Sequence, residues 1–112
     1  MSAYITKLNQ EKYKKFTETG LVLVDIWATW CNPCRTLLPI IEEVSTDYHG
    51  KLSVGKLDAD ENMELAKELN VRSLPTILIY KDGEVVDRST GLITKQAIIG
   101  MVSKHMDESI EF

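Results

Sequence analysis

The only two cysteines of the 112-residue chain, Cys31 and Cys34, lie in the sequence WCNPC. Thiols at this spacing can form a structural disulfide, supply half of a metal site, or act as a redox pair. Disulfide exchange requires a thiolate as the attacking group. A free cysteine with a pKa of about 8.5 is only about 3% thiolate at pH 7. The local structure around the pair therefore decides what it can do.

The residues around the pair predict a strand that leads into a helix. Residues 21–27 (LVLVDIW) form an apolar run typical of a strand buried on both faces. An apolar stripe predicts a helix over residues 33–49, and Pro33 suits its first position. Cys31 is thus expected just before the helix and Cys34 in its first turn, where the helix dipole favours a thiolate. A strand, a CxxC and a helix in this order indicate a redox pair.

Zinc and a structural staple are the weaker alternatives. A structural zinc site needs four ligands, and the only other soft donors are His49 and His105. His49 is predicted at the far end of the helix that begins with the cysteines, roughly 22 Å away at 1.5 Å per residue. Stable structural disulfides are rare in the cytoplasm, and so short a loop restrains the unfolded chain little. No metal site is expected.

Length and composition are those of an ordinary globular protein. A chain of 112 residues predicts a single domain, residues 1–112. The net charge of -4 and the lack of a dense Lys/Arg cluster disfavour a nucleic-acid partner. No signal-peptide pattern opens the sequence, and no apolar run approaches the roughly 18 residues of a membrane span. We therefore expect no membrane partner and a cytoplasmic location.

The rest of the chain predicts alternating strands and helices. Strands are expected near residues 4–6 and at 52–58, 76–80 and 84–89, the last two joined by a turn in which Gly83 supplies a positive φ. Helices are expected over residues 10–19, about 61–69 and after Thr94, capped by Asn9, Asp60 and Thr94. The acidic tail, residues 107–112, is expected to fray. Residues expected to face inward on the last two helices are Met63, Leu65, Ala66, Leu69, Ala97, Ile98, Met101 and Val102.

The resulting order is βαβαβα followed by ββα. Strands separated by helices are expected to pair in parallel through right-handed crossovers, whereas the closing hairpin must be antiparallel. The predicted fold class is therefore α/β, a central mixed sheet of about five strands flanked on both faces by about four helices.

Four segments together resemble thioredoxins: VDIWATWCNPC (24–34), GKLDAD (55–60), VRSLPTILIYKDGE (71–84) and STGLITKQAI (89–98). The resemblance covers nearly the whole chain and implies the thioredoxin fold. It also implies a monomer that reduces protein disulfides with no bound cofactor, through a redox-active disulfide recharged by a flavin-containing thioredoxin reductase. By this resemblance, Cys31 is the nucleophile and Cys34 the resolving thiol.

Asp25 lies inside the apolar run, where a carboxylate is costly unless it is protonated or partnered. Either the strand ends there and Asp25 meets water, or Asp25 is a base with a raised pKa that helps to deprotonate Cys34, for instance through a water. The resemblance supports the base. Lys56 matches the lysine that accompanies this aspartate in thioredoxins, although the composition alone would make it a solvent-facing lysine.

The resemblance also predicts a groove that contacts the substrate. Trp30 matches the family's exposed tryptophan beside the nucleophile, whereas Trp27 is expected in the core. Pro75 matches the family's cis-proline, which would leave the backbone of Leu74 free to pair with an extended substrate segment. Gly91 matches a glycine that borders this groove, and it could equally form a simple turn before the last helix.

Asn32 stands where thioredoxins usually have glycine, between the nucleophile and Pro33, in a pair of residues that tunes the redox potential in the family. Its side chain could cap the helix or hydrogen-bond a sulfur, and the sequence does not give the sign of the effect. A more oxidising pair would make the protein a disulfide isomerase or oxidase. A binding module without redox turnover is a further alternative, which the intact cysteines, Asp25 and Pro75 argue against.

Overall fold

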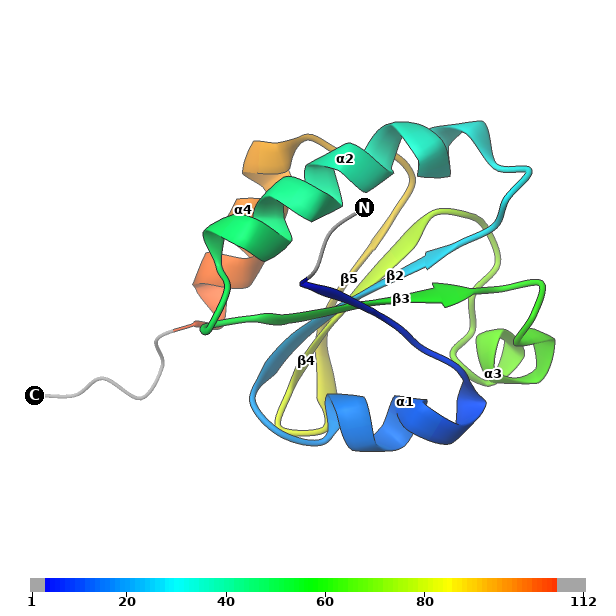
Figure 1. Ribbon diagram of the computed structural model, residues 1–112, viewed down its shortest axis with the longest axis horizontal. Coiled ribbons are helices and arrows are strands. Elements are labelled where there is room, and N and C mark those ends of the chain that lie inside the picture. Colours follow the sequence, from blue (N-terminus) through cyan, green and yellow to red (C-terminus); the bar gives the residue numbers. More distant parts are fainter. Residues whose placement is uncertain (1–3, 107–112) are drawn as a thin grey trace, which may run out of the picture.

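A computed structural model describes residues 4–106 of the chain, so the prediction for the acidic tail lies outside the described residues. The elements follow one another in the predicted order (Figure 1). They are β1 Ile5–Lys7, α1 Gln10–Thr17, β2 Leu21–Trp27, α2 Asn32–Asp47, β3 Ser53–Asp58, α3 Met63–Glu68, β4 Thr76–Lys81, β5 Glu84–Thr90 and α4 Lys95–Lys104.

The described strands form one sheet in the order β1-β3-β2-β4-β5, with β2 at its centre. β3 runs parallel to β1 and to β2, whereas β4 runs antiparallel to β2 and to β5. Helices α2 and α4 cover one face of the sheet, and α1 and α3 lie on the other (Figure 1). The predicted fold class, a mixed sheet of five strands flanked by four helices, is therefore confirmed.

One prediction about strand direction is wrong. A helix separates β3 from β4, which led us to expect parallel strands, yet β4 is antiparallel to β2. Helix α3 has six residues and spans roughly 9 Å. The connection that contains it does not return the chain along the six residues of β3, which extend roughly 20 Å. The chain therefore enters β4 at the same end of the sheet at which it left β3.

Alternation along the strands produces two apolar cores, one on each face of the sheet. On one face Leu23 of β2 packs in a buried cluster with Leu37 and Ile41 of α2 and Ile98 of α4. On the other face the second cluster includes Val24 of β2 and, from the opposing helices, Tyr13 and Leu65. Because both faces of β2 are covered, its residues 22–26 are all buried, as the apolar run predicted.

The predicted caps and turn are confirmed with one exception. The side chains of Asn9 and Thr94 accept backbone N–H groups of Lys12 and Ala97, so they cap α1 and α4. Gly83 has a φ of 92° in the turn between β4 and β5.

The predicted N-cap Asp60 is wrong. The cap residue of α3 is Asn62, which makes no capping side-chain hydrogen bond. The short helix begins two residues after the predicted start, because Asp58 accepts the N–H groups of Asp60 and Glu61 and holds that segment in a turn.

Two residues predicted to face inward are also misplaced. Met63, the first residue of α3, is 71% exposed, and Ala97 on α4 is exposed as well. Each lies in the first turn of its helix, where the apolar pattern did not determine which side of the helix faces the core.

Gly55 in β3 lies where α1 packs on the sheet, and it yields a test of that packing. A Cβ atom there would lie 2.6 Å from Cδ1 of the buried Leu8 and 2.9 Å from Cε2 of Phe16. Gly55→Ala should lower the free energy of unfolding by about 1–2 kcal/mol, because overpacking outweighs the smaller entropy of the unfolded chain.

Gly100→Ala is the matched control, because Gly100 lies in α4 with no atom within 4 Å of an ideal Cβ. Alanine there should raise the free energy of unfolding by about 0.5–1 kcal/mol. Urea unfolding measures both variants. A Gly55→Ala protein as stable as the wild type would contradict the close contact between α1 and β3.

Candidate active site

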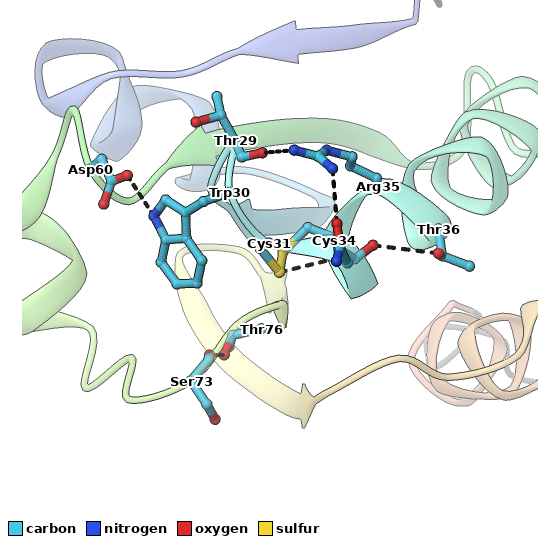
Figure 2. The surroundings of a disulfide bond; sticks show 10 residues. Thr29, Trp30, Cys31, Cys34, Arg35, Thr36, Asp60, Ser73 and Thr76 are labelled. Carbon is cyan, nitrogen blue, oxygen red and sulfur yellow. Dashed lines mark hydrogen bonds between the residues drawn. A yellow bond between two sulfur atoms is a disulfide. The ribbon is translucent and has the colours of Figure 1, made fainter.

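The two cysteines lie where the chain leaves the central strand and begins α2. Cys31 is the N-cap residue of α2, and its Sγ accepts the backbone N–H of Cys34 at 3.2 Å. The two residues form a disulfide with their Cα atoms 5.3 Å apart (Figure 2). Their placement, just before the helix and in its first turn, is as predicted. The helix N-terminus thus directs a backbone donor at the sulfur of Cys31, an arrangement that favours its thiolate once the disulfide is reduced.

The side chain of Asn32 does not take the capping role that was one of its expected uses. Its Oδ1 accepts a hydrogen bond from Nη1 of Arg35 at 2.8 Å, and Nη2 of Arg35 donates to the carbonyl oxygen of Thr29 at 2.6 Å. The guanidinium therefore joins the residues before and after Cys31 (Figure 2). Asn32 is the first residue of the helix, so Pro33 occupies the second position rather than the predicted first.

Asp25 is buried in the middle of β2, with only 1% of its surface exposed. It pairs in register with Lys56 of β3 and with Ile77 of β4. Burial raises the pKa of Asp25 to about 7, although the charge of Lys56 acts in the opposite direction. The alternative that the strand ends early and leaves Asp25 in water is therefore wrong, because pairing continues beyond it to Trp27.

Asp25 and Cys34 line the same small cavity. It has a volume of ≈ 60 Å³, and its lining includes Asp25, Cys34, Arg35 and Lys56. Oδ1 of Asp25 has no hydrogen-bond partner within residues 4–106. A space of this size can hold water, and an unpaired carboxylate oxygen gives that water an acceptor. The cavity thus brings the residues Asp25 and Cys34 to one small enclosed space.

The exposed position predicted for Trp30 is confirmed, whereas the core position predicted for Trp27 is not. Trp30 is 64% exposed, and its Nε1 donates to Oδ2 of Asp60 at 2.8 Å (Figure 2). Trp27 is half-buried beside the cysteine pair, and the ammonium of Lys56 lies 5.5 Å from its ring centroid. The carboxylate of Asp60 therefore fixes the orientation of an exposed aromatic ring.

The loop before β4 forms the opposite side of the site. Leu74 packs against the buried cluster that contains both cysteines, and the Leu74–Pro75 peptide bond is cis, as the resemblance implied. Gly91 has a φ of 94°, and its N–H donates to the carbonyl oxygen of Pro75 at 2.8 Å. Leu92, which follows, is exposed. The predicted groove residues are therefore brought to the same end of the sheet as the cysteines.

The donors that the zinc alternative requires are not gathered around the cysteines in the described residues. From residue 4 to residue 106, no group of three or more His, Cys, Asp and Glu side chains is placed to hold a metal ion. The ring of His49, which follows the C-terminal end of α2, lies against Tyr4 with the ring centroids 3.9 Å apart. Over the same residues, no helix is long and apolar enough to cross a membrane.

Arg35 is the residue of this site that our sequence reasoning missed. The signal was present, because residues three apart on a helix are neighbours, and Arg35 follows Asn32 by three. The second acceptor, the carbonyl oxygen of Thr29, is a backbone atom in a loop, and no sequence pattern announces such a contact.

Comparisons with known proteins agree with the geometry. The family described as Thioredoxin matches residues 4–104. Proteins named thioredoxin from Staphylococcus aureus and Staphylococcus saprophyticus are each 40% identical over 102 residues, or 91% of this chain and 98% of theirs. A mutant thioredoxin from Halobacterium salinarum superposes with a TM-score of 0.86 at 30% identity, with 96% of each chain covered. The chain therefore belongs to the thioredoxin family, and its Cys31–Cys34 disulfide is the redox centre of a thiol–disulfide oxidoreductase.

Proposed function

We propose that the chain reduces disulfides in other proteins by a two-step exchange in which Cys31 attacks and Cys34 resolves. The observation that carries this assignment is the difference between the surroundings of the two sulfurs. Sγ of Cys31 accepts a backbone N–H at the start of α2, whereas Cys34 lines the cavity that also contains Asp25. The first environment stabilises a thiolate, and the second supplies a base.

In the first step, the thiolate of Cys31 attacks one sulfur of the substrate disulfide. A bond forms between Cys31 and that sulfur, and the other substrate sulfur leaves as a thiolate. The groove formed by Trp30, Leu74 and Gly91 positions the substrate segment, which pairs in extended form with the backbone of Leu74. Pro75 orients that backbone beside the cysteines.

In the second step, Asp25 accepts the proton of Cys34, directly or through a water in the cavity. The thiolate of Cys34 then attacks Cys31, the mixed disulfide breaks, and the second substrate sulfur leaves reduced. A base whose pKa is about 7 is partly ionised near neutral pH and can accept this proton. Lys56 limits the cost of the charged carboxylate.

The protein leaves this cycle oxidised, so two electrons must restore the dithiol. By family resemblance the donor is a flavin-containing thioredoxin reductase, and the substrates are proteins with accessible disulfides. We further propose that residues 1–112 act as one monomeric domain in the cytoplasm, where a reducing environment suits this direction of exchange.

Substitution of each cysteine tests the order of attack. Cys31→Ser should abolish disulfide reduction, because no nucleophile remains for the first step. Cys34→Ser should still attack and should accumulate mixed disulfides that are visible on non-reducing gels. Insulin reduction measures turnover. Normal turnover by the Cys34→Ser protein with no added dithiol would show that the assignment is wrong.

Asp25→Asn should stabilise the fold as the pH rises and slow the resolving step. The native pKa of about 7 exceeds the unfolded value of about 3.9, so the native state binds more protons between these values and loses stability as pH rises through them. Ionisation of Asp25 therefore lowers the free energy of unfolding of the wild type, by about 4 kcal/mol above pH 7 and not at all below pH 4. Asparagine removes this loss.

Urea unfolding of the wild type and the Asp25→Asn variant at pH 4 and pH 8 measures this difference. An equal difference in stability at both pH values would contradict a raised pKa, as would an Asp25 pKa of about 4 by NMR. Rapid-mixing kinetics of the release of reduced substrate measures the resolving step separately.

The reduction potential separates a reductase from the isomerase alternative. We expect a value near that of thioredoxin, about −270 mV, and a change of at most about 20–45 mV in Asn32→Gly, because one hydrogen bond contributes about 1–2 kcal/mol. Equilibration with a glutathione buffer measures both proteins. A wild-type potential above about −200 mV would favour an isomerase.

A further inference from the structure

Arg35 has no part in the exchange described above, yet it touches both sides of the redox centre. Its guanidinium donates to the carbonyl oxygen of Thr29 and to Oδ1 of Asn32, the residues on either side of Trp30 and Cys31. Figure 2 shows the guanidinium beside the carbonyl oxygen of Thr29. Because the guanidinium is a planar fork, two such bonds fix its orientation in a way that a single bond cannot.

The same residue lines the cavity that contains Asp25 and Cys34. Arg35 is exposed to solvent, whereas Asp25 is buried and its Oδ1 has no partner among residues 4–106. Arg35 therefore borders the space that Asp25 shares with Cys34, reaches solvent, and is anchored at its tip on the loop. Long charged side chains commonly cover apolar space in this way, with the stem packed and the charged end in water.

We propose that Arg35 is a positioning residue that closes the mouth of the Asp25 cavity, and that Thr29 and Asn32 hold it there. Asn32 then matters through Arg35 rather than through a sulfur atom. The functional consequence rests on the proposed role of Asp25 as the base for Cys34. With the mouth closed, the proton of Cys34 passes to Asp25 instead of exchanging with bulk water.

The alternative role for Arg35 is that of a nearby positive charge, and the two roles predict opposite signs. The groups that face Asp25 are Lys56 from β3 and Cys34 and Arg35 from α2, while β4 contributes the apolar Ile77. Loss of a positive charge would raise the pKa of Asp25, because its carboxylate would be less stabilised. Loss of the cover would admit water and lower the pKa, because the carboxylate would be better solvated.

Arg35→Ala removes both the side chain that closes the cavity and its positive charge. The sign of the change in the pKa of Asp25 therefore decides which of the two roles matters. In the disulfide form, where no thiol titrates, a carboxyl-carbon NMR titration should show the pKa of Asp25 falling by about one unit. An unchanged or higher pKa would overturn the proposal. The control is Arg72→Ala, which removes an equal charge from an exposed residue outside the cavity lining and should leave the Asp25 titration unchanged.

Asn32→Ala tests the anchor. It should shift the Asp25 titration in the same direction by less, because Thr29 still accepts one hydrogen bond. The double variant Asn32→Ala/Arg35→Ala should show the same Asp25 pKa as Arg35→Ala alone. Each substitution removes the same hydrogen bond between Asn32 and Arg35, so the second change adds nothing. A larger shift in the double variant would show that Asn32 acts independently, contrary to the proposal.

A kinetic measurement distinguishes failure of this proposal from failure of the proposed function. In Arg35→Ala, the pH profile of the resolving step should move to lower pH together with the Asp25 titration. If the pKa of Asp25 falls and the pH profile of the resolving step does not move, Arg35 closes the cavity but Asp25 is not the base. If neither moves, Arg35 does not close the cavity.

Discussion

Burial of the central strand β2 on both faces and both edges is the constraint on which the rest of the molecule depends. Helices cover each face, and β3 and β4 pair with its two edges, so the backbone of β2 has no freedom to slip. A shift of one residue would move Leu23 and Val24 into each other's cores. The same register fixes where the strand ends, and hence where Cys31 meets the N-terminus of α2.

The reversed direction of β4 completes the site that β2 begins. The carboxyl ends of β2 and β3 lie at the same end of the sheet as the start of β4. Pro75, directly before β4, therefore lies at the end of the sheet where the cysteines lie. Had β4 run parallel to β2, its first residues would lie at the opposite end of the sheet, roughly 20 Å away along a six-residue strand. The path of the connection from β3 to β4 thus brings Pro75 and the cysteines to the same end of the sheet.

The sequence predicted those features that local residue patterns determine. Apolar periodicity gave the order of the elements, and side-chain caps such as Asn9 and Thr94 marked helix starts because each cap bonds a backbone N–H a few residues away. The cis bond before Pro75 came from family resemblance alone, since residue chemistry favours trans. Buried Asp25 could be recognised as unusual because one carboxyl group interrupts an apolar run.

Other features could not be predicted because they depend on contacts between segments. The direction of β4 depends on the path of the connection from β3, which propensities do not encode. Asp60 resembled a helix cap in sequence, but Asp58 turns the segment and Asp60 accepts from Trp30 instead. The contact of Arg35 with the carbonyl oxygen of Thr29 likewise requires the folded loop.

The surroundings of Asp25 show how the fold balances stability against reactivity. A well-paired carboxylate would stabilise the protein more, but a strong partner would lower its pKa and leave it a poor base near neutral pH. Lys56 lies beside Asp25 in register, yet no hydrogen bond reaches Oδ1 from the described residues, and burial outweighs the lysine's charge. Asp25 and Cys34 line the same small cavity, so an oxygen without a protein partner lies beside the cysteine for which we propose it as the base. Apolar packing on both faces of β2 offsets the free-energy cost of burying this carboxyl group. The strand that is covered on both faces and paired on both sides can therefore tolerate an acid with an unpaired oxygen.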